Sequence, residues 1–290
     1  MKKILLQLDT DPYFSSFDAI VAYDGGADCV LSYGCVTPEK VGPLVEGAIF
    51  TRAAKDKKNT AIFIGGRDLL AGQALLAAVK TKFFGEFRVS VMLDSNGSNT
   101  TAAAGVAQIA ASTELSGKKA VVLAGTGPVG QRAAALLAKE GAEVTLTSRE
   151  LTRAEEACLA LRERFGVEVI PLEAKDFMAR AEAIAQAHIV FAAGKAGVCL
   201  LEEAAWRDNP NLEVLLDANA TPPLGIAGIV ATDRGKARYG KLCFGALGFG
   251  SLKLALHKAC IAQLFERPDL ILDAEEIYVV AKSMAQKIRR

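Results

Sequence analysis

The sequence predicts an α/β protein made of two α/β lobes, the second of which is a Rossmann-type, doubly wound parallel sheet. The chain has 290 residues, more than one domain of usual size. Short apolar runs alternate with longer helical patterns, as in parallel sheets with right-handed crossovers. A Gly-Thr-Gly-Pro-Val-Gly motif at 125–130 follows one apolar run and opens an alanine-rich helix.

The first lobe is predicted over residues 1–112 and is completed by two C-terminal helices within 251–290. Apolar runs that end in polar or glycine-rich clusters predict its strands, at 3–8, 60–64 and 88–93. Helical patterns lie at 14–23, 38–52, 68–82, 98–111, 251–265 and 273–288. Parallel strands bring their carboxyl ends to one edge, so the clusters that begin at Asp9, Gly65 and Asp94 are expected to share a ligand site.

The second lobe is predicted over residues 113–250. Its strands are expected at 119–124, 143–147, 167–170, 188–192 and 213–217. Helices are expected at 131–140, 152–165 and 174–186. The regular alternation of the two element types is the pattern of a parallel sheet covered by helices.

Composition excludes several classes of protein and partner. With 51% apolar residues, 23% charged residues and a net charge of +1, nothing indicates a nucleic-acid surface or a disordered chain, so the partner is expected to be a small molecule. The apolar run near the N-terminus stops at Gln7 and Asp9, too short for a signal segment or a membrane span, which favours the cytoplasm.

Cysteine and histidine do not form a metal-binding pattern. The six cysteines contain no CxxC pair and are expected to be small core residues. Only His257 and Cys260 share a helical spacing, and a tetrahedral site needs more ligands than these two. No metal is predicted.

The motif at 125–130 has the features of a dinucleotide-binding loop. Gly125 allows a tight turn, Gly127 lets the backbone approach a pyrophosphate, and Gly130 allows the helix to pack closely on the strand. The free N–H groups and the positive dipole end of the following helix favour a phosphate. The predicted cofactor contacts are therefore Gly125, Thr126, Gly127, Pro128, Val129 and Gly130.

The end of the second strand of this lobe indicates which dinucleotide is bound. An NAD site usually carries an acidic residue here, but this chain has Ser148 and Arg149, with Arg153 close by. A hydroxyl and a guanidinium suit the 2′-phosphate of NADP. Two alternatives stay open: Arg149 is a solvated loop charge, or Glu150 binds the ribose of NAD.

Two later segments are candidates for holding the nicotinamide half of the cofactor. Ala193 and Gly194 follow one predicted strand. Asp217 is the last residue of another predicted strand, and Asn219 follows it. Small residues there would let a cofactor approach the backbone. The alternative is that both segments are ordinary turns.

With both lobes considered, the chain resembles the bacterial NADP-dependent methylene-tetrahydromethanopterin dehydrogenases of methylotrophs. Its most specific block is Asp-Ser-Asn-Gly-Ser-Asn-Thr-Thr at 94–101. The matching blocks, which span most of the chain, are 17–18, 23–28, 36–38, 60–66, 92–105, 125–130, 222–226 and 244–248. The resemblance implies hydride transfer from a methylene-tetrahydropterin to NADP⁺, acceptance of the tetrahydrofolate derivative in some members, and a homo-oligomer of three or more copies.

This implied reaction removes no proton at the reacting carbon, which fits a chain without a Ser/His/Asp or Cys/His arrangement. Carboxylates could bind pterin N–H groups or stabilise the product cation, and neutral polar groups could add hydrogen bonds. The candidate substrate residues are Asp9, Asp11, Asp24, Asp94, Asn96, Ser98, Thr100 and Thr101. The alternative for Asp94, Ser98 and Asn99 is helix capping, and Asp18 and Asp28 are expected on the surface.

Lys253 matches a lysine that the resemblance associates with the active site. A charged lysine beside a forming cation is unfavourable, so contact with a pterin carbonyl or an anionic part of the substrate is expected, or partial neutralisation through burial. The alternative is a helix lysine that faces solvent.

Two competing functions remain. A shikimate-type dehydrogenase joins similar lobes but depends on a lysine–aspartate pair, and no lysine here lies in a matching motif. A non-catalytic NADP-sensing protein would keep the fold without the chemistry. The polar block at 94–101 speaks against the second function.

Overall fold

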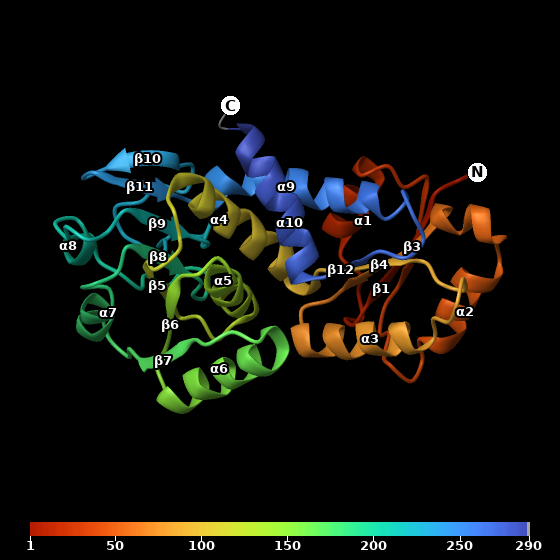
Figure 1. The fold of residues 1–290 in the computed structure, drawn as a ribbon, viewed down its shortest axis with the longest axis horizontal. Coiled ribbons are helices and arrows are strands. Elements are labelled where there is room, and N and C mark those ends of the chain that lie inside the picture. Colours follow the sequence, from red (N-terminus) through yellow and green to blue (C-terminus); the bar gives the residue numbers. More distant parts are fainter. Residues whose placement is uncertain (289–290) are drawn as a thin grey trace. The chain divides into compact units, whose positions relative to one another are not determined.

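A computed structural model describes residues 1–288 of the chain (Figure 1). The chain divides into two compact units: the first unit comprises Met1–Thr100 and Leu254–Val280, and the second unit comprises Thr101–Lys253 and the residues from Ala281 onward. Each change of unit falls inside a helix and not in a loop. The boundary predicted after residue 112 lies at the end of the helix Ser98–Ser112, whereas the chain changes unit near the start of that helix, after Thr100.

The first unit contains a five-stranded, wholly parallel sheet in the order β12-β4-β3-β1-β2. Its strands are β1 (Ile4–Asp9), β2 (Cys29–Tyr33), β3 (Thr60–Gly65), β4 (Ser90–Leu93) and β12 (Ile271–Leu272). The helices that belong wholly to it are α1 (Ser16–Asp24), α2 (Gly42–Phe50) and α3 (Leu69–Thr81). The order reverses between β1 and β3, and a ligand crevice is expected beyond the carboxyl ends of strands at such a point.

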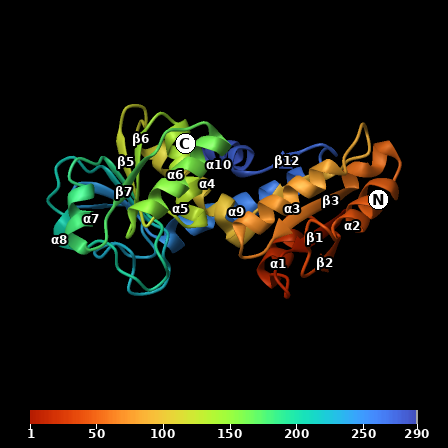
Figure 2. The same ribbon diagram turned by 90° about the horizontal axis from the view of Figure 1, so that it is seen from below.

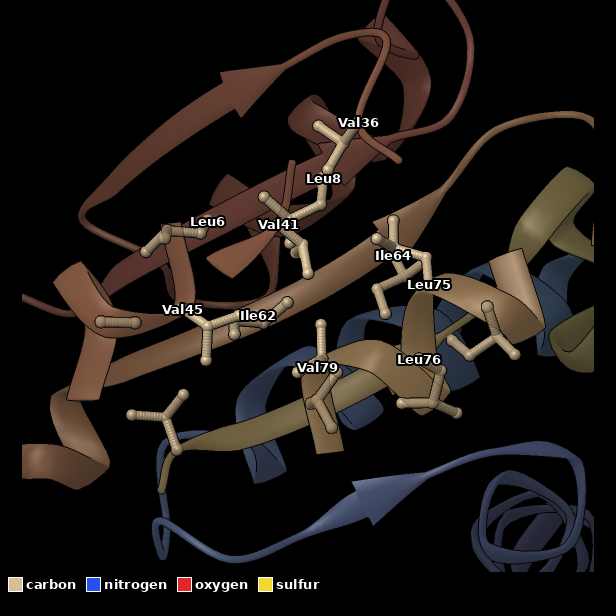
Figure 3. Close-up of a cluster of buried hydrophobic side chains, with 14 of the residues drawn as sticks. Leu6, Leu8, Val36, Val41, Val45, Ile62, Ile64, Leu75, Leu76 and Val79 are labelled. Carbon is tan, nitrogen blue, oxygen red and sulfur yellow. The ribbon is translucent and has the colours of Figure 1, made fainter. Parts of the chain in front are cut away.

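One face of this sheet packs against α2 and α3 through fully apolar side chains (Figure 3). Ile62 and Ile64 of β3 contact the face of α3 that carries Leu75 and Val79, at helical spacing. Asp68 begins α3, because its carboxylate accepts the N–H groups of Leu70 and Ala71. The buried face of the sheet fixes the strand register, and with it the positions of the loops at the carboxyl edge.

Three helices cross the division between the units: α4 (Ser98–Ser112), α9 (Ala246–Gln263) and α10 (Ala274–Ile288). Sequence patterns predicted α9 to begin at residue 251, but the structure begins it at Ala246. The added first turn contains Gly248, where a Cβ would lie 1.7 Å from the carbonyl oxygen of Asp233. The close approach of backbone to backbone requires glycine there and outweighs its poor helix propensity.

The second unit contains a seven-stranded sheet in the order β10-β11-β9-β8-β5-β6-β7 (Figure 1), of which β5, β6 and β7 can also be followed in Figure 2. Its strands are β5 (Lys119–Leu123), β6 (Glu143–Ser148), β7 (Ile170–Glu173), β8 (Ile189–Ala192), β9 (Val214–Asp217), β10 (Arg234–Arg238) and β11 (Lys241–Phe244). Its helices are α5 (Pro128–Lys139), α6 (Leu151–Phe165), α7 (Phe177–Ala183) and α8 (Glu203–Trp206). All strands are parallel except β10, and the order reverses between β5 and β8, as in a Rossmann sheet. The predicted fold class is confirmed.

Some elements differ from the prediction. The strand expected at 167–170 lies at Ile170–Glu173, and β2, β10, β11 and β12 were not predicted. Cys35 is exposed and takes a left-handed backbone conformation with φ 52°, so the prediction of a core residue is wrong there. Cys158, Cys243 and Cys260 are buried as predicted. Within residues 1–288, no helix is both long and apolar enough to cross a membrane.

Candidate dinucleotide and substrate sites

The glycine loop lies at the point where the strand order of the second unit reverses, between β5 and α5. Thr147 of β6 holds the start of the loop: its hydroxyl accepts the N–H of Ala124 at 3.0 Å, and its carbonyl accepts the N–H of Gly125 at 2.9 Å. At the far end, Gln131 donates its side-chain N–H to the carbonyl of Thr126 at 2.7 Å. The loop conformation is therefore fixed by the protein alone.

The three glycines of the motif meet different surroundings. A Cβ on Gly130 would lie 2.6 Å from the Cα of Gly125, and a Cβ on Gly125 would lie 2.7 Å from Leu146. A Cβ on Gly127 would meet nothing within 4 Å. Packing therefore explains why residues 125 and 130 are glycine, while the open side of Gly127 leaves room for a ligand at the N-terminus of α5.

The predicted 2′-phosphate contacts lie at the end of β6. Ser148 is buried and its hydroxyl accepts the N–H of Glu150 at 3.4 Å, whereas Arg149 is exposed. Glu150 begins α6 and lies 3.7 Å from the guanidinium of Arg153, so its carboxylate already has a cationic partner. Arg149 has no acidic partner among the ion pairs of the described residues.

The residues predicted to hold the nicotinamide half lie after β8 and β9. The N–H of Ala193 donates to the carbonyl of Leu123 at 3.0 Å, which places this turn beside β5. A Cβ on Gly194 would lie 2.7 Å from Leu200, so close packing with the loop requires this glycine. Arg180 is buried and donates to the carbonyl of Leu200 at 2.6 Å, which anchors the end of the same loop.

The polar atoms of Asp217 and Asn219 are occupied within their own loop. Asp217 is fully buried and accepts the N–H groups of Asn219 and Ile226, both at 2.9 Å. Burial raises the pKa of Asp217, although these N–H groups oppose part of the rise. Asn219 accepts the N–H of Thr221 and donates to the carbonyl of Pro223. Both side chains shape the loop that follows β9.

In the first unit, the carboxyl ends of β1 and β3 bring several carboxylates together. Asp9 is buried and accepts the N–H groups of Asp11 and Ser15, at 2.9 and 3.2 Å. Burial raises the pKa of Asp9, and the same two N–H groups oppose the rise. Asp11 is paired with the exposed Arg67, at 2.9 Å.

Asp18 was expected on the surface, but it is half-buried beside this group. A Cβ on Gly65 would lie 3.3 Å from Oδ2 of Asp9 and 3.6 Å from Oδ2 of Asp18. The two carboxylates and the ring of Phe63 therefore lie close over Gly65 and leave little room for a side chain there. The Phe-Asp block at 17–18 was the only signal in the sequence that marked Asp18.

The block at 94–101 mainly builds the start of α4. Asp94 is buried, and its two carboxylate oxygens accept the backbone N–H of Thr100 at 3.0 Å and its hydroxyl at 2.6 Å. Ser98 donates to the carbonyl of Ser95 at 2.7 Å. The capping alternative describes the contacts of Asp94, Ser98 and Thr100.

The remaining candidates of the first lobe lie apart from one another. Asn96 is exposed, with a left-handed φ of 55°, and its N–H donates to the carbonyl of Gly66, so it lies at the carboxyl edge. Thr101 is half-buried on α4. Asp24 ends α1 at the opposite edge of the sheet, where it pairs with Lys258 at 2.7 Å. The structure does not bring Asp24 together with Asp9 and Asp11.

Lys253 and His257 lie one turn apart on α9. Lys253 is half-buried at the point where the chain passes from the second unit to the first. His257 is fully buried and stacks on Phe63 of β3, with ring centroids 5.4 Å apart. Within residues 1–288, no three His, Cys, Asp or Glu side chains are grouped to hold a metal ion.

Family models match two stretches of the chain. Residues 16–96 match the N-terminal domain of methylene-tetrahydromethanopterin dehydrogenase, and residues 112–225 match a putative NAD(P)-binding domain. The solved structures include shikimate 5-dehydrogenases from Listeria monocytogenes (13% identity, 96% of both chains, TM-score 0.57) and Mycobacterium fortuitum (16% identity, 97% and 98% of the chains, TM-score 0.54). At these identities the likeness shows a shared fold alone.

Two curated proteins of Methylorubrum extorquens match at full length. One, named bifunctional protein MdtA, is 58% identical over 98% of this chain and 99% of its own. The other, named NAD(P)-dependent methylenetetrahydromethanopterin dehydrogenase, is 33% identical over the same shares. These full-length matches agree with the glycine loop and with the domain matches. The chain belongs to the methylene-tetrahydromethanopterin dehydrogenase family.

Proposed function

We propose that this protein is an oxidoreductase that reversibly transfers hydride from methylene-tetrahydromethanopterin to NADP⁺, and that it also accepts methylene-tetrahydrofolate. The observation that carries the proposal is the full-length similarity to a named dehydrogenase of this reaction, in a chain whose glycine loop lies at the reversal point of a Rossmann sheet. Its domain matches cover both a dehydrogenase-specific N-terminal domain and an NAD(P)-binding domain.

The second unit is proposed to hold NADP. The open side of Gly127 and the free N–H groups at the start of α5 fit a pyrophosphate, and the buried Ser148 with the exposed Arg149 fits a 2′-phosphate. When bound, the nicotinamide of NADP⁺ supplies the hydride acceptor. The remaining proposed cofactor contacts are Ala193 and Gly194, whose loop is fixed by Leu200 and Arg180.

The first unit is proposed to bind the pterin at the carboxyl edge of its sheet. Asp9 and Asp18 lie close over Gly65, and Asp11 lies beside them. Carboxylates at this place can accept the N–H groups of a pterin. Asp9, whose pKa burial raises, can also stabilise a neighbouring cation when ionised. Lys253 is proposed to contact a carbonyl or an anionic part of the substrate.

One assay tests reaction, cofactor and carrier together. Formation of reduced nicotinamide is followed with methylene-tetrahydromethanopterin and methylene-tetrahydrofolate, each with NADP⁺ and with NAD⁺. We expect turnover with NADP⁺ and at least the first carrier. In Arg149→Gln, loss of a charge-assisted contact is expected to raise KM for NADP⁺ by about 10-fold or more while KM for NAD⁺ stays unchanged. Arg162→Gln, at an exposed arginine near the other end of α6, is the matched control. No turnover with either carrier would refute the function.

We further propose that the protein acts in the cytoplasm as a homo-oligomer of three or more copies. The similarity to a named metabolic dehydrogenase family supports both the assembly and the location. Light scattering of the full chain measures the first, and fractionation of cells that express it measures the second.

A further inference from the structure

The charged side chains at the carboxyl edge of the first unit's sheet are ordered by exposure. Asp9 is buried, the side chain of Asp11 is 25% exposed, and that of Arg67 is 82% exposed. Asp11 links the other two, because its N–H donates to Asp9 at 2.9 Å and its carboxylate accepts the Nε–H of Arg67 at 2.9 Å. The edge therefore passes from negative charge in the interior to positive charge at the surface.

The backbone that carries Arg67 is held on both sides. Gly66 precedes it with φ 100°, and a Cβ there would lie 2.0 Å from the hydroxyl oxygen of Thr10. The carbonyl of Gly66 also accepts the N–H of Asn96 at 2.7 Å. Asp68 follows and begins α3 by accepting two N–H groups of that helix. The backbone position of Arg67 is thus fixed before any ligand arrives.

The guanidinium of Arg67 keeps donors that the protein does not use. Its Nε–H is bonded to Asp11, and its two terminal NH₂ groups have no partner within residues 1–288. The neighbouring carboxylate of Asp68 is occupied by the first turn of α3. A guanidinium can bind a carboxylate or a phosphate through two parallel hydrogen bonds. Arg67 therefore suits an anion that approaches from solvent.

An exposed aromatic ring lies on the loop that follows Asp9. The N–H groups at both ends of loop 11–15 donate to the Asp9 carboxylate, at 2.9 and 3.2 Å. A Cβ on Gly34 would lie 2.4 Å from the carbonyl oxygen of Pro12, so the loop also packs closely on the chain after β2. Tyr13, in the middle of this held loop, is 89% exposed. Its ring is available to stack on a planar group of a ligand.

The carriers of the proposed reaction have three chemically different parts. A reduced pterin supplies one nitrogen of the methylene bridge, an aryl amine supplies the other, and a tail beyond the aryl ring ends in anions. The anions are glutamate carboxylates in tetrahydrofolate and a phosphate-linked dicarboxylic acid in tetrahydromethanopterin. Asp9 and Asp11 can accept pterin N–H groups but repel an anionic tail. The pterin is therefore expected at the buried end of this charge order and the tail at the exposed end.

We propose that Arg67 binds the anionic tail of the carrier and that Tyr13 stacks on its aryl ring. The Cα atoms of Tyr13 and Asp11 are at most about 7 Å apart, because two residues separate them along the chain, and Asp11 pairs directly with Arg67. Both residues thus lie beside the proposed pterin contacts. This subsite rests on the proposed function, since the carriers are the substrates of that reaction.

The charge of the tail tests Arg67. Calorimetry with the full-length protein measures the binding of tetrahydrofolate and of its diamide, in which both glutamate carboxylates are uncharged amides. Arg67→Gln is expected to weaken binding of tetrahydrofolate about 3- to 10-fold, because water screens part of the lost contact, and to leave binding of the diamide unchanged. Tetrahydromethanopterin with and without its phosphate-linked end gives the same comparison for the other carrier. Arg88→Gln is the matched control, since the Nε–H of Arg88 donates to a carbonyl just before β4, at the opposite edge of the sheet.

Substitutions of Tyr13 test the stacking. Tyr13→Ala is expected to weaken binding of tetrahydrofolate and of its diamide equally, about 3- to 10-fold, because both contain the aryl ring. Tyr13→Phe keeps the ring and should bind both as the original does. In Arg67→Gln and Tyr13→Ala, KM for the carrier should rise by the same factor as the dissociation constant, with kcat and KM for NADP⁺ unchanged, since only binding is lost.

Each part of the subsite has a result that would overturn it. For Arg67, this is an Arg67→Gln protein that binds tetrahydrofolate as the original does, or that loses affinity for the diamide equally. A raised KM for NADP⁺ with unchanged carrier binding would assign Arg67 to a cofactor phosphate instead. For Tyr13, it is a Tyr13→Ala protein with unchanged affinity. Normal turnover with neither effect would refute the subsite alone, whereas no turnover by the original protein would refute the proposed function.

Discussion

The three glycines of the loop at 125–130 have different physical reasons to be glycine. Gly125 and Gly130 approach each other and Leu146 so closely that a Cβ on either would overlap neighbouring atoms. Gly127 has no such neighbour, and its φ of −77° suits any residue. The protein itself thus gives no packing reason for glycine at 127, and cofactor approach remains as the reason.

This difference predicts opposite effects of two alanine substitutions. Gly127→Ala is expected to keep the free energy of unfolding within about 1 kcal/mol of the original, since only a helix cap is altered. Its added methyl group would obstruct the pyrophosphate and raise KM for NADP⁺ about 10-fold or more. Gly130→Ala is expected to lower the free energy of unfolding by about 1–3 kcal/mol through overpacking. Denaturant unfolding and initial rates measure both, and equal stability losses would contradict the distinction.

At the scale of elements, the polar block at 94–101 shows how a motif can have two explanations. Its residue types are suited to binding a pterin, and its spacing is suited to capping a helix. The structure uses Asp94, Ser98 and Thr100 for the first turn of α4. Residue types alone cannot separate the two uses, because carboxylates and hydroxyls accept N–H groups from a ligand or from a helix equally well.

The contacts of Asp94 predict a structural effect of its loss. Asp94→Ala removes the acceptors for the N–H and the hydroxyl of Thr100, both inside the protein. We expect the free energy of unfolding to fall by about 1–3 kcal/mol. Thr100→Ser keeps the hydroxyl and should lose less than about 1 kcal/mol. Chemical denaturation measures each loss, and an Asp94→Ala protein as stable as the original would show that the cap contributes nothing.

Sequence periodicity predicted the elements that have a long apolar pattern of their own. The strands β1, β3, β5, β8 and β9 are buried central strands, and their largely continuous apolar runs were recognised. The polar strand β10 and the edge strand β2 were missed. β10 has three cations in five residues and is a strand only because it pairs with β11. Pairing partners of that kind lie outside any local sequence window.

The candidate site was predictable to a similar degree. The glycine loop and its neighbours at the end of β6 follow from a local motif within one βαβ unit. The convergence of Asp9 and Asp18 over Gly65 depends on three segments of chain and on which side of α1 Asp18 takes. The position of Asp24 at the opposite edge depends on the length of α1, which carries it away from the carboxyl end of β1. Neither arrangement has a local signal.

At the scale of the whole molecule, acid stability depends on buried carboxylates that have partners. Burial acts to raise the pKa of Asp233, but the hydrogen bonds from Arg238 and from the N–H of Val230 outweigh it and hold the pKa below its ordinary value. A carboxyl whose pKa is lower in the folded than in the unfolded protein stabilises the fold at pH values above its unfolded pKa. This stabilisation is lost as the pH falls through its folded pKa.

Removal of this charge should therefore flatten the acid side of the stability curve. Asp233→Asn is expected to be less stable than the original at neutral pH and to approach it as pH falls below about 4. Asp208→Asn, at an exposed ion pair, should change stability by less than about 1 kcal/mol at any pH. Thermal unfolding from neutral to acid pH measures the curves. A constant difference between the original and Asp233→Asn would contradict the assignment.

The pairing of β12 with β4 has a consequence for how the chain folds during synthesis. Ile271 pairs with Val91, and residues 254–280 belong to the first unit, so that unit needs chain that the ribosome delivers after residues 101–253 of the second unit. The sheet of the second unit is contained in residues 119–244 and is complete earlier. The sheet of the first unit is therefore completed after the sheet of the dinucleotide domain, and it stays open at the β4 side until residues 271–272 have been made.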